Sequence, residues 1–127
     1  MNGILSQSVG VWRAWTPTFT GFSSDPTITF ARYVLIGKTC ICTVVMGNGT
    51  SNATTFTMTL PAVAANTGIA KSAGASAVDN GAALTTTPRV DTAANSNVAT
   101  IRSTPAAGAW TASSTKRVEF TITYETT

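Results

Sequence analysis

Few side chains in this 127-residue sequence could perform acid–base chemistry. It contains no histidine, which removes the commonest general base and excludes Ser-His-Asp and Cys-His arrangements. The carboxylates are Asp25, Asp79, Asp91, Glu119 and Glu125. A glycoside hydrolase needs two of them at a defined separation, and Asp79 and Asp91 flank a predicted hairpin that could bring them together. The competing interpretation, which we favour, makes Asp79 part of the turn Asp79-Asn80-Gly81.

Metal and cofactor sites are not indicated by the sequence. Cys40 and Cys42 face the same side of a predicted strand, with Cα atoms roughly 6.5 Å apart and parallel Cβ vectors. That geometry is poor for a disulfide, so we predict two small buried thiols. The sparse acids do not suggest calcium, and the glycines match no phosphate-binding spacing. We therefore expect no metal, no cofactor and no enzymatic activity.

Aromatic side chains are the remaining candidates for ligand binding. Trp110 follows the loop Pro105-Ala-Ala-Gly108, and we expect its indole to stack on carbohydrate, with Arg102 and Asn97 as polar contacts nearby. The competing interpretation, which we favour for the indole taken by itself, places Trp110 in the core or in a contact between subunits. We expect Trp15 in the core because it alternates within a strand, and Trp12 at one end of the domain or against a neighbouring chain.

The composition favours one β-rich domain. Charged residues make up 10% of the chain, far below the roughly 25% of typical soluble domains, while 43% of residues are hydrophobic. There are 25 threonines, which favour strands because they are β-branched and whose hydroxyls tolerate water on an outer face. Solubility carried by hydroxyls rather than charges is typical of extracellular proteins and of particles.

The charge pattern and the apolar runs limit the partners. The net charge is +3, but the basic residues are scattered and only Lys116 and Arg117 are adjacent, so we do not expect nucleic-acid binding. No apolar run approaches 18 residues, so we expect no membrane insertion, and residues 1–10 do not resemble a secretory signal. The lack of a disulfide framework predicts folding in a reducing cytosol.

The hairpin around Gly37 is the clearest local element. Residues 26–36 are apolar-rich, and Ile36-Gly37-Lys38 supplies a turn in which glycine can take a positive φ. The next strand, residues 39–46, is apolar on both faces: Cys40, Cys42, Val44 and Met46 lie on one, Ile41 and Val45 on the other. Its second face must therefore be covered, either by symmetric association or by a loop.

Period-2 alternation predicts further strands along the chain. The expected segments are residues 14–20, 54–60 (ended by Pro61), a weak pair within 68–90, 97–102 and 117–125. In the last of these, Val118, Phe120, Ile122 and Tyr124 face one way. Eight or nine short strands predict an all-β fold, an antiparallel sandwich or jelly roll. We expect residues 1–13 to be a lead-in segment, in which residues 4–12 are either irregular or a short helix, and residues 14–127 to form one domain.

Three motifs in order carry a family resemblance. Trp15-Thr-Pro-Thr-Phe19-Thr-Gly21, a Tyr-x-x-Ile-Gly-Lys hairpin at Tyr33–Lys38 and a Phe-Thr-x-Thr-Leu-Pro strand end at Phe56–Pro61 resemble the C-terminal modules of tailed-phage tail fibres and tailspikes. The resemblance covers roughly residues 12–61. It implies a β-sandwich that closes a homotrimer at the fibre tip and recognises a host surface glycan, either capsule or lipopolysaccharide.

The resemblance also implies a location and a possible longer partner. The module would be made in the bacterial host cytoplasm and act in the virion, at the phage tail, beside a longer fibre or spike chain. Met1 just ahead of the family block would fit a product of an internal start, a separate gene or a trimmed chain. The main alternative is a structural virion protein that caps or decorates an assembly and binds no ligand.

Overall fold

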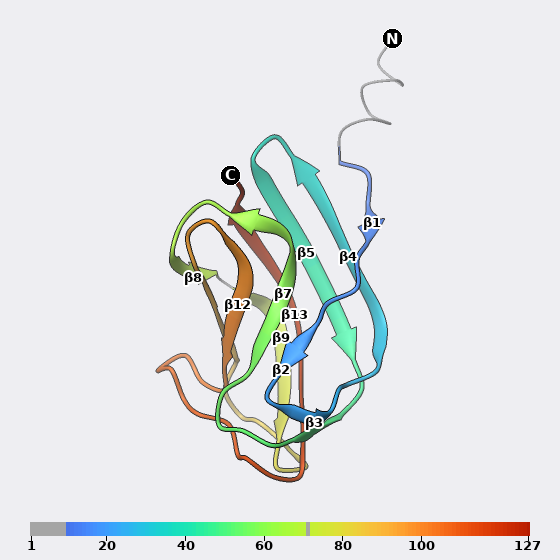
Figure 1. Cartoon of the computed structure of the whole chain (residues 1–127), viewed down its shortest axis with the longest axis vertical. Helices are drawn as coiled ribbons and strands as arrows, with labels where there is room; N and C mark the ends of the chain where they lie inside the picture. Colours follow the sequence, from blue (N-terminus) through green and yellow to red (C-terminus); the bar gives the residue numbers. More distant parts are fainter. Residues whose placement is uncertain (1–9, 71) are drawn as a thin grey trace.

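Alternating strands build two antiparallel sheets in the computed structural model, which describes residues 10–70 and 72–127 (Figure 1). The large sheet holds β1 (Arg13–Ala14), β3 (Phe22–Ser24), β4 (Ile28–Ile36), β5 (Thr39–Met46), β6 (Gly49–Ser51), β9 (Ser72–Asp79), β10 (Ala82–Ala83) and β13 (Thr115–Glu125). The small sheet holds β2 (Phe19–Thr20), β7 (Thr57–Ala64), β8 (Gly68–Ala70), β11 (Arg89–Thr92) and β12 (Ser96–Arg102). No helix occurs in the described ranges, so the predicted all-β sandwich is confirmed.

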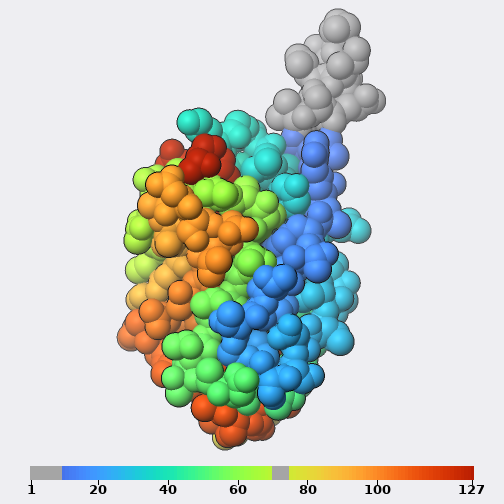
Figure 2. Space-filling view, viewed as in Figure 1, coloured from blue at the N-terminus to red at the C-terminus, as the bar shows by residue number. Residues whose placement is uncertain are grey.

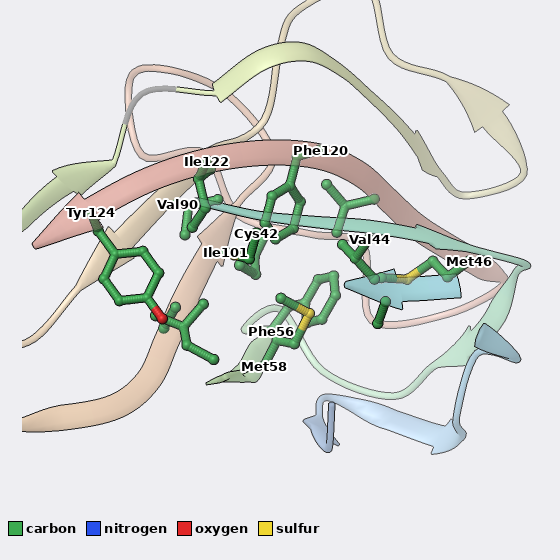
Figure 3. Packing of buried hydrophobic residues seen from close by; sticks show 14 of the residues in the cluster. Cys42, Val44, Met46, Phe56, Met58, Val90, Ile101, Phe120, Ile122 and Tyr124 are labelled. Carbon is green, nitrogen blue, oxygen red and sulfur yellow. The ribbon is translucent and has the colours of Figure 1, made fainter. Parts of the chain in front are cut away.

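The core lies between the two sheets and is filled by residues of alternating parity. Figure 3 shows Phe120, Ile122 and Tyr124 of β13 pointing toward Phe56 and Met58. The predicted inward face of the last strand is therefore confirmed. Burying such alternating apolar side chains is the main driving force that holds the sheets together.

Cys40 and Cys42 lie in this core as free, fully buried thiols, as predicted. Their hydrogen bond and their burial away from water raise the pKa of the Cys42 thiol. On the neighbouring strand, burial also raises the pKa of Tyr124, whose hydroxyl donates to the Ala62 carbonyl at 2.9 Å and accepts from the Ala62 amide at 3.1 Å. Tyr124 thus ties β13 to β7 across the sandwich.

Both predicted tight turns are present. Gly37 has φ +59° and, with Lys38, joins β4 to β5, where Ile36 pairs with Thr39. Asn80 and Gly81 have φ values of +52° and +76° and join β9 to β10. Two positive φ values in a two-residue loop are typical of a type I′ hairpin, which explains the Asn-Gly sequence.

Three expectations about strand limits are wrong. Pro61 does not end its strand, since β7 continues to Ala64. The register of the neighbouring strand β12 shifts between Ser96 and Val98, so the ladder tolerates the amide that Pro61 lacks. The predicted strand 14–20 is split into β1 and β2 around Pro17. The structure has more strands than the eight or nine expected, because several are only two or three residues long.

The N-terminal expectations are only partly covered by the structure. The first strand begins at Arg13, inside the segment we took as a lead-in, and pairs with Tyr33 of β4. Most of the predicted short helix falls on residues 4–9, which lie outside the described residues, and residues 10–12 form no regular element.

Candidate functional site

Trp110 is not exposed, and the expectation of a stacking surface there is wrong. Its side chain is 2% exposed, its ring packs on Phe56 with centroids 5.5 Å apart, and its Nε1 donates to the Ile101 carbonyl at 2.8 Å. The loop from Ser103 to Ser114 turns the indole inward because the Trp110 amide also bonds the Thr54 carbonyl at 3.0 Å. The alternative interpretation, a core indole with a satisfied N–H, therefore holds.

Trp15 and Trp12 differ in burial. Trp15 packs at the margin of the core, edge-on to Tyr33 at 6.3 Å, and its Nε1 donates to the Thr59 carbonyl at 3.3 Å. Its expected place in the core is confirmed only in part, because the side chain is partly buried and lies between β1 and β2 rather than within a strand. Trp12 is 49% exposed beside β4, which leaves it available to a neighbouring chain.

An unexpected cation lies beside Trp110. Lys116 is fully buried, with Nζ 4.8 Å from the ring centroid of Phe22 and 5.6 Å from that of Phe56, and it donates to the Ala53 carbonyl at 3.1 Å. Burial lowers the pKa of Lys116, and the Asp79 carboxylate opposes this shift. The sequence held a signal for this, since Lys116 shares the inward parity of Val118. The Lys116 side chain has no surface exposed to solvent, so it is not part of a surface binding site.

Arg102 lies on the outer face of the small sheet in a cluster with Asp91 and Arg89. Asp91 accepts two hydrogen bonds from Arg89, at 2.7 and 2.9 Å, and one from Nε of Arg102 at 3.3 Å. The hydrogen bond from Arg89 holds the pKa of Asp91 below its usual range. Two guanidinium groups against one carboxylate leave the cluster with one net positive charge.

Threonine hydroxyls continue this surface across the sheet. Thr20 and Thr57 share a hydrogen bond of 2.6 Å, Thr57 pairs with Thr100, and Thr100 pairs with Asp91. Figure 2 shows the strands that carry this row side by side on the front face, with β2 in blue, β7 in green and β12 in orange. We call it the threonine–arginine face; it comprises Thr20, Thr57, Thr100, Arg102, Asp91 and Arg89.

The three predicted contacts are not brought together. Asn97 is exposed near the far end of β12, about 16 Å from Arg102 at about 3.3 Å of rise per residue. Trp110 lies inside the sandwich, so neither residue can share a ligand with it. The prediction of a single site formed by Trp110, Arg102 and Asn97 is therefore corrected: only Arg102 and Asn97 remain on the surface, and they lie apart.

Asp79 and Asp91 do not form a catalytic pair. Asp79 ends β9 in the large sheet, where both its oxygens accept from the Thr111 amide at 3.1 Å. Asp91 lies on the outer face of the small sheet and is held by two arginines. Because the two carboxylates belong to different sheets and each has its own partners, the hypothesis of a two-carboxylate hydrolase loses its basis.

A second surface is mostly apolar. The pairs Phe30–Val45 and Val34–Ile41 of β4 and β5 point away from the core, with the polar pair Arg32–Thr43 between them. Ile36 follows with 48% of its surface exposed, whereas Val34 is 4% exposed. We call this the β4–β5 outer face; it comprises Phe30, Val34, Ile36, Ile41 and Val45. The predicted apolar second face of residues 39–46 is thus confirmed, and Phe30 on it is 42% exposed.

No family model, curated protein or solved structure shows a significant match to the chain. Within residues 10–70 and 72–127, no three His, Cys, Asp or Glu side chains gather as a metal site would require. The same residues contain no helix of the length and hydropathy needed to span a bilayer. Function is therefore argued from the surfaces themselves.

Proposed function

We propose that this chain is a non-enzymatic tip module of a phage tail fibre or tailspike, a jelly-roll-like sandwich that forms a homotrimer and binds host cell-surface carbohydrate. The observation that carries the proposal is the β4–β5 outer face. The apolar side chains of this face flank one polar pair, Arg32–Thr43, and their exposure on an otherwise threonine-covered domain favours burial against copies of the same chain.

The family resemblance supports the same proposal through one strand. Tyr33 of the hairpin motif lies on β4, which also carries the outer face, whereas Trp15 lies between β1 and β2, and both rings pack toward the core. Trp12, just before them, is exposed and can extend that contact. The same block of sequence would then both close the sandwich at its edge and join neighbouring chains.

Carbohydrate binding fits the polar surfaces that remain. The threonine–arginine face offers hydroxyl groups and one net positive charge, and glycans present hydroxyls and, in many capsules, acidic groups. Each such contact is weak, and three copies at one tip would raise the overall avidity by raising the effective concentration.

The alternative function, a capping or decoration protein without a ligand, is favoured by one observation. Trp110 is sealed in the core and Trp15 is half-buried, so the well-exposed aromatic rings among the described residues are Trp12 and Phe30, and Phe30 lies on the face proposed to be buried between chains. Under this alternative the sandwich would contribute only its shape and its subunit contacts.

Two measurements separate these functions. Sedimentation equilibrium gives the number of 13.1 kDa chains per particle, and three are expected. A glycan array and calorimetry with purified capsule and lipopolysaccharide then test binding. A trimer that binds no glycan supports the structural alternative, whereas a monomer at all concentrations contradicts both.

A further inference from the structure

A small cavity opens at the end of the sandwich opposite the Trp110 loop. It has a volume of about 170 Å³ and lies between the last residues of β13 and the turn that leads from β7 into β8. Thr123 and Glu125 line it from β13, Asn66 and Ile69 from the β7–β8 segment, and Thr92 from β11. Two strands, β5 and β13, separate it from β4 and the centre of the apolar face.

Hydrogen bonds already hold the cavity wall in place. The Asn66 amide donates to Oε2 of Glu125 at 2.8 Å, and the Thr92 hydroxyl donates to the Asn66 carbonyl at 3.0 Å. The Thr67 hydroxyl oxygen, also in the wall, accepts from the Ala94 amide at 3.0 Å. A wall fixed in advance loses little entropy when a ligand binds.

The side chains of the cavity wall still offer both acceptors and donors of hydrogen bonds. Glu125 keeps an oxygen that can accept, and Thr67, whose oxygen already accepts a backbone N–H, keeps a proton to donate. The Thr92 hydroxyl has donated its proton to main-chain carbonyls and retains acceptor capacity. A ligand group that both donates and accepts, namely a hydroxyl, satisfies such a wall best.

Charge and size narrow the ligand class. Among the described lining residues Glu125 supplies the one carboxylate, which disfavours an anion and is too few for a divalent cation, since such a cation takes several oxygen ligands. Ile69, 60% exposed, offers an apolar wall for C–H groups. The volume is below the roughly 300–1,000 Å³ of sites for drug-sized molecules, which suits one unit of a polymer.

We propose that this cavity binds one neutral sugar unit of the surface glycan, with Glu125 as the principal hydrogen-bond acceptor and Ile69 packing against the sugar ring. The inference rests on the proposed function and names its site. It adds a site for a single sugar unit to the threonine–arginine face, at the end of the sandwich opposite Trp110.

The test is an NMR titration of the full chain with glucose, galactose, mannose and N-acetylglucosamine, each added separately. At least one sugar is expected to shift the signals of Thr67, Ile69 and Thr123. Glu125→Ala should lower the affinity roughly tenfold, since a hydrogen bond to a charged group is lost. Glu119→Ala, which removes a carboxylate from the same strand outside the cavity, should leave the affinity unchanged. Glu125→Gln preserves the shape of the side chain and takes the place of Glu125→Ala if that variant folds poorly.

The outcomes are distinct. If capsule or lipopolysaccharide binds the wild-type chain, and Glu125→Ala binds it equally well with shifts elsewhere, the cavity is not the site although the proposed function stands. If neither polysaccharides nor monosaccharides bind, both are overturned. A response to ethanolamine without any response to sugars would overturn the inference in favour of an ammonium site.

Discussion

Lys116 places an ammonium group inside the aromatic end of the core. Within the described residues its ammonium donates to the Ala53 carbonyl. The Ser51 hydroxyl also lies 3.3 Å from that carbonyl, but its one proton is shared with the closer Thr111 carbonyl. Ala53 is only partly buried, so water can replace the amine as its partner. Because a buried charge costs more in desolvation than a single hydrogen bond returns, a hydrophobic side chain of similar length should suit the site.

Lys116→Met should raise the free energy of unfolding at pH 7 by about 1 kcal/mol. The burial that lowers the pKa of Lys116 makes the unfolded chain bind more protons between the lowered value and the ordinary 10.5. Wild-type stability should therefore rise through that window, and the advantage of the variant should shrink. Urea unfolding of both chains from pH 7 to 10.5 measures this. A difference independent of pH would contradict it.

Gly21, unlike Lys116, cannot be replaced without strain. It has φ +93°, and a Cβ there would lie 2.2 Å from the Thr55 carbonyl oxygen. Gly21→Ala should lower the free energy of unfolding by about 3 kcal/mol, combining left-handed strain with a backbone clash. Gly37→Ala is the matched control, because Gly37 also has positive φ but no atom within 4 Å. The control should cost about 1 kcal/mol. Equal urea midpoints for the two variants would refute the clash.

Residue types predicted burial well only where a strand fixed their parity. Val118 and Cys42 were placed correctly because neighbours two positions away share their face. Trp110 was misplaced because a loop has no parity, and its inward turn depends on long-range bonds to Ile101 and Thr54 that no local pattern encodes. The cavity was missed for the same reason, since Asn66 and Glu125 are distant in sequence.

At the scale of elements, β7 and β13 are joined by one hydroxyl. Tyr124→Phe removes both bonds to Ala62 and should lower the free energy of unfolding by about 1–2 kcal/mol, leaving a partly buried amide without that partner. Tyr33→Phe is the control, because no hydrogen bond to its hydroxyl occurs within the described residues. Chemical denaturation of the two variants compares them. A similar loss in both would show that the Tyr124 bonds contribute little.

The presence of a turn could be predicted from the residues within it, whereas the length of a strand could not. Gly37 and the Asn80-Gly81 pair predicted their hairpins because positive φ values need such residues. Pro61 misled because its effect depends on the neighbouring strand: β12 is irregular opposite it, so no ladder amide is required there. The register between β7 and β12 depends on how the two strands pair, so it cannot be predicted from the sequence of either strand alone.

At the scale of the whole molecule, the proposed trimer depends on one sheet face. Phe30→Lys, on the β4–β5 outer face, should convert the trimer to monomers without loss of fold, because a charge would be buried at the contact. Val98→Lys, on the outer face of the small sheet with the same 42% exposure, is the control and should remain trimeric. Sedimentation velocity with circular dichroism distinguishes them. Two trimeric variants would place the contact elsewhere.

The order of strands along the chain has a consequence for synthesis. β13 pairs with β5, β6 and β9, and every other described strand precedes it. A ribosome must therefore release residues up to Glu125 before the large sheet can be completed. Until then the edges of β5 and β9 stay open to pairing with other nascent chains. Polysomes translating this message would hold many such unfinished sheets close together, so slow translation before residue 115 should favour aggregation over assembly.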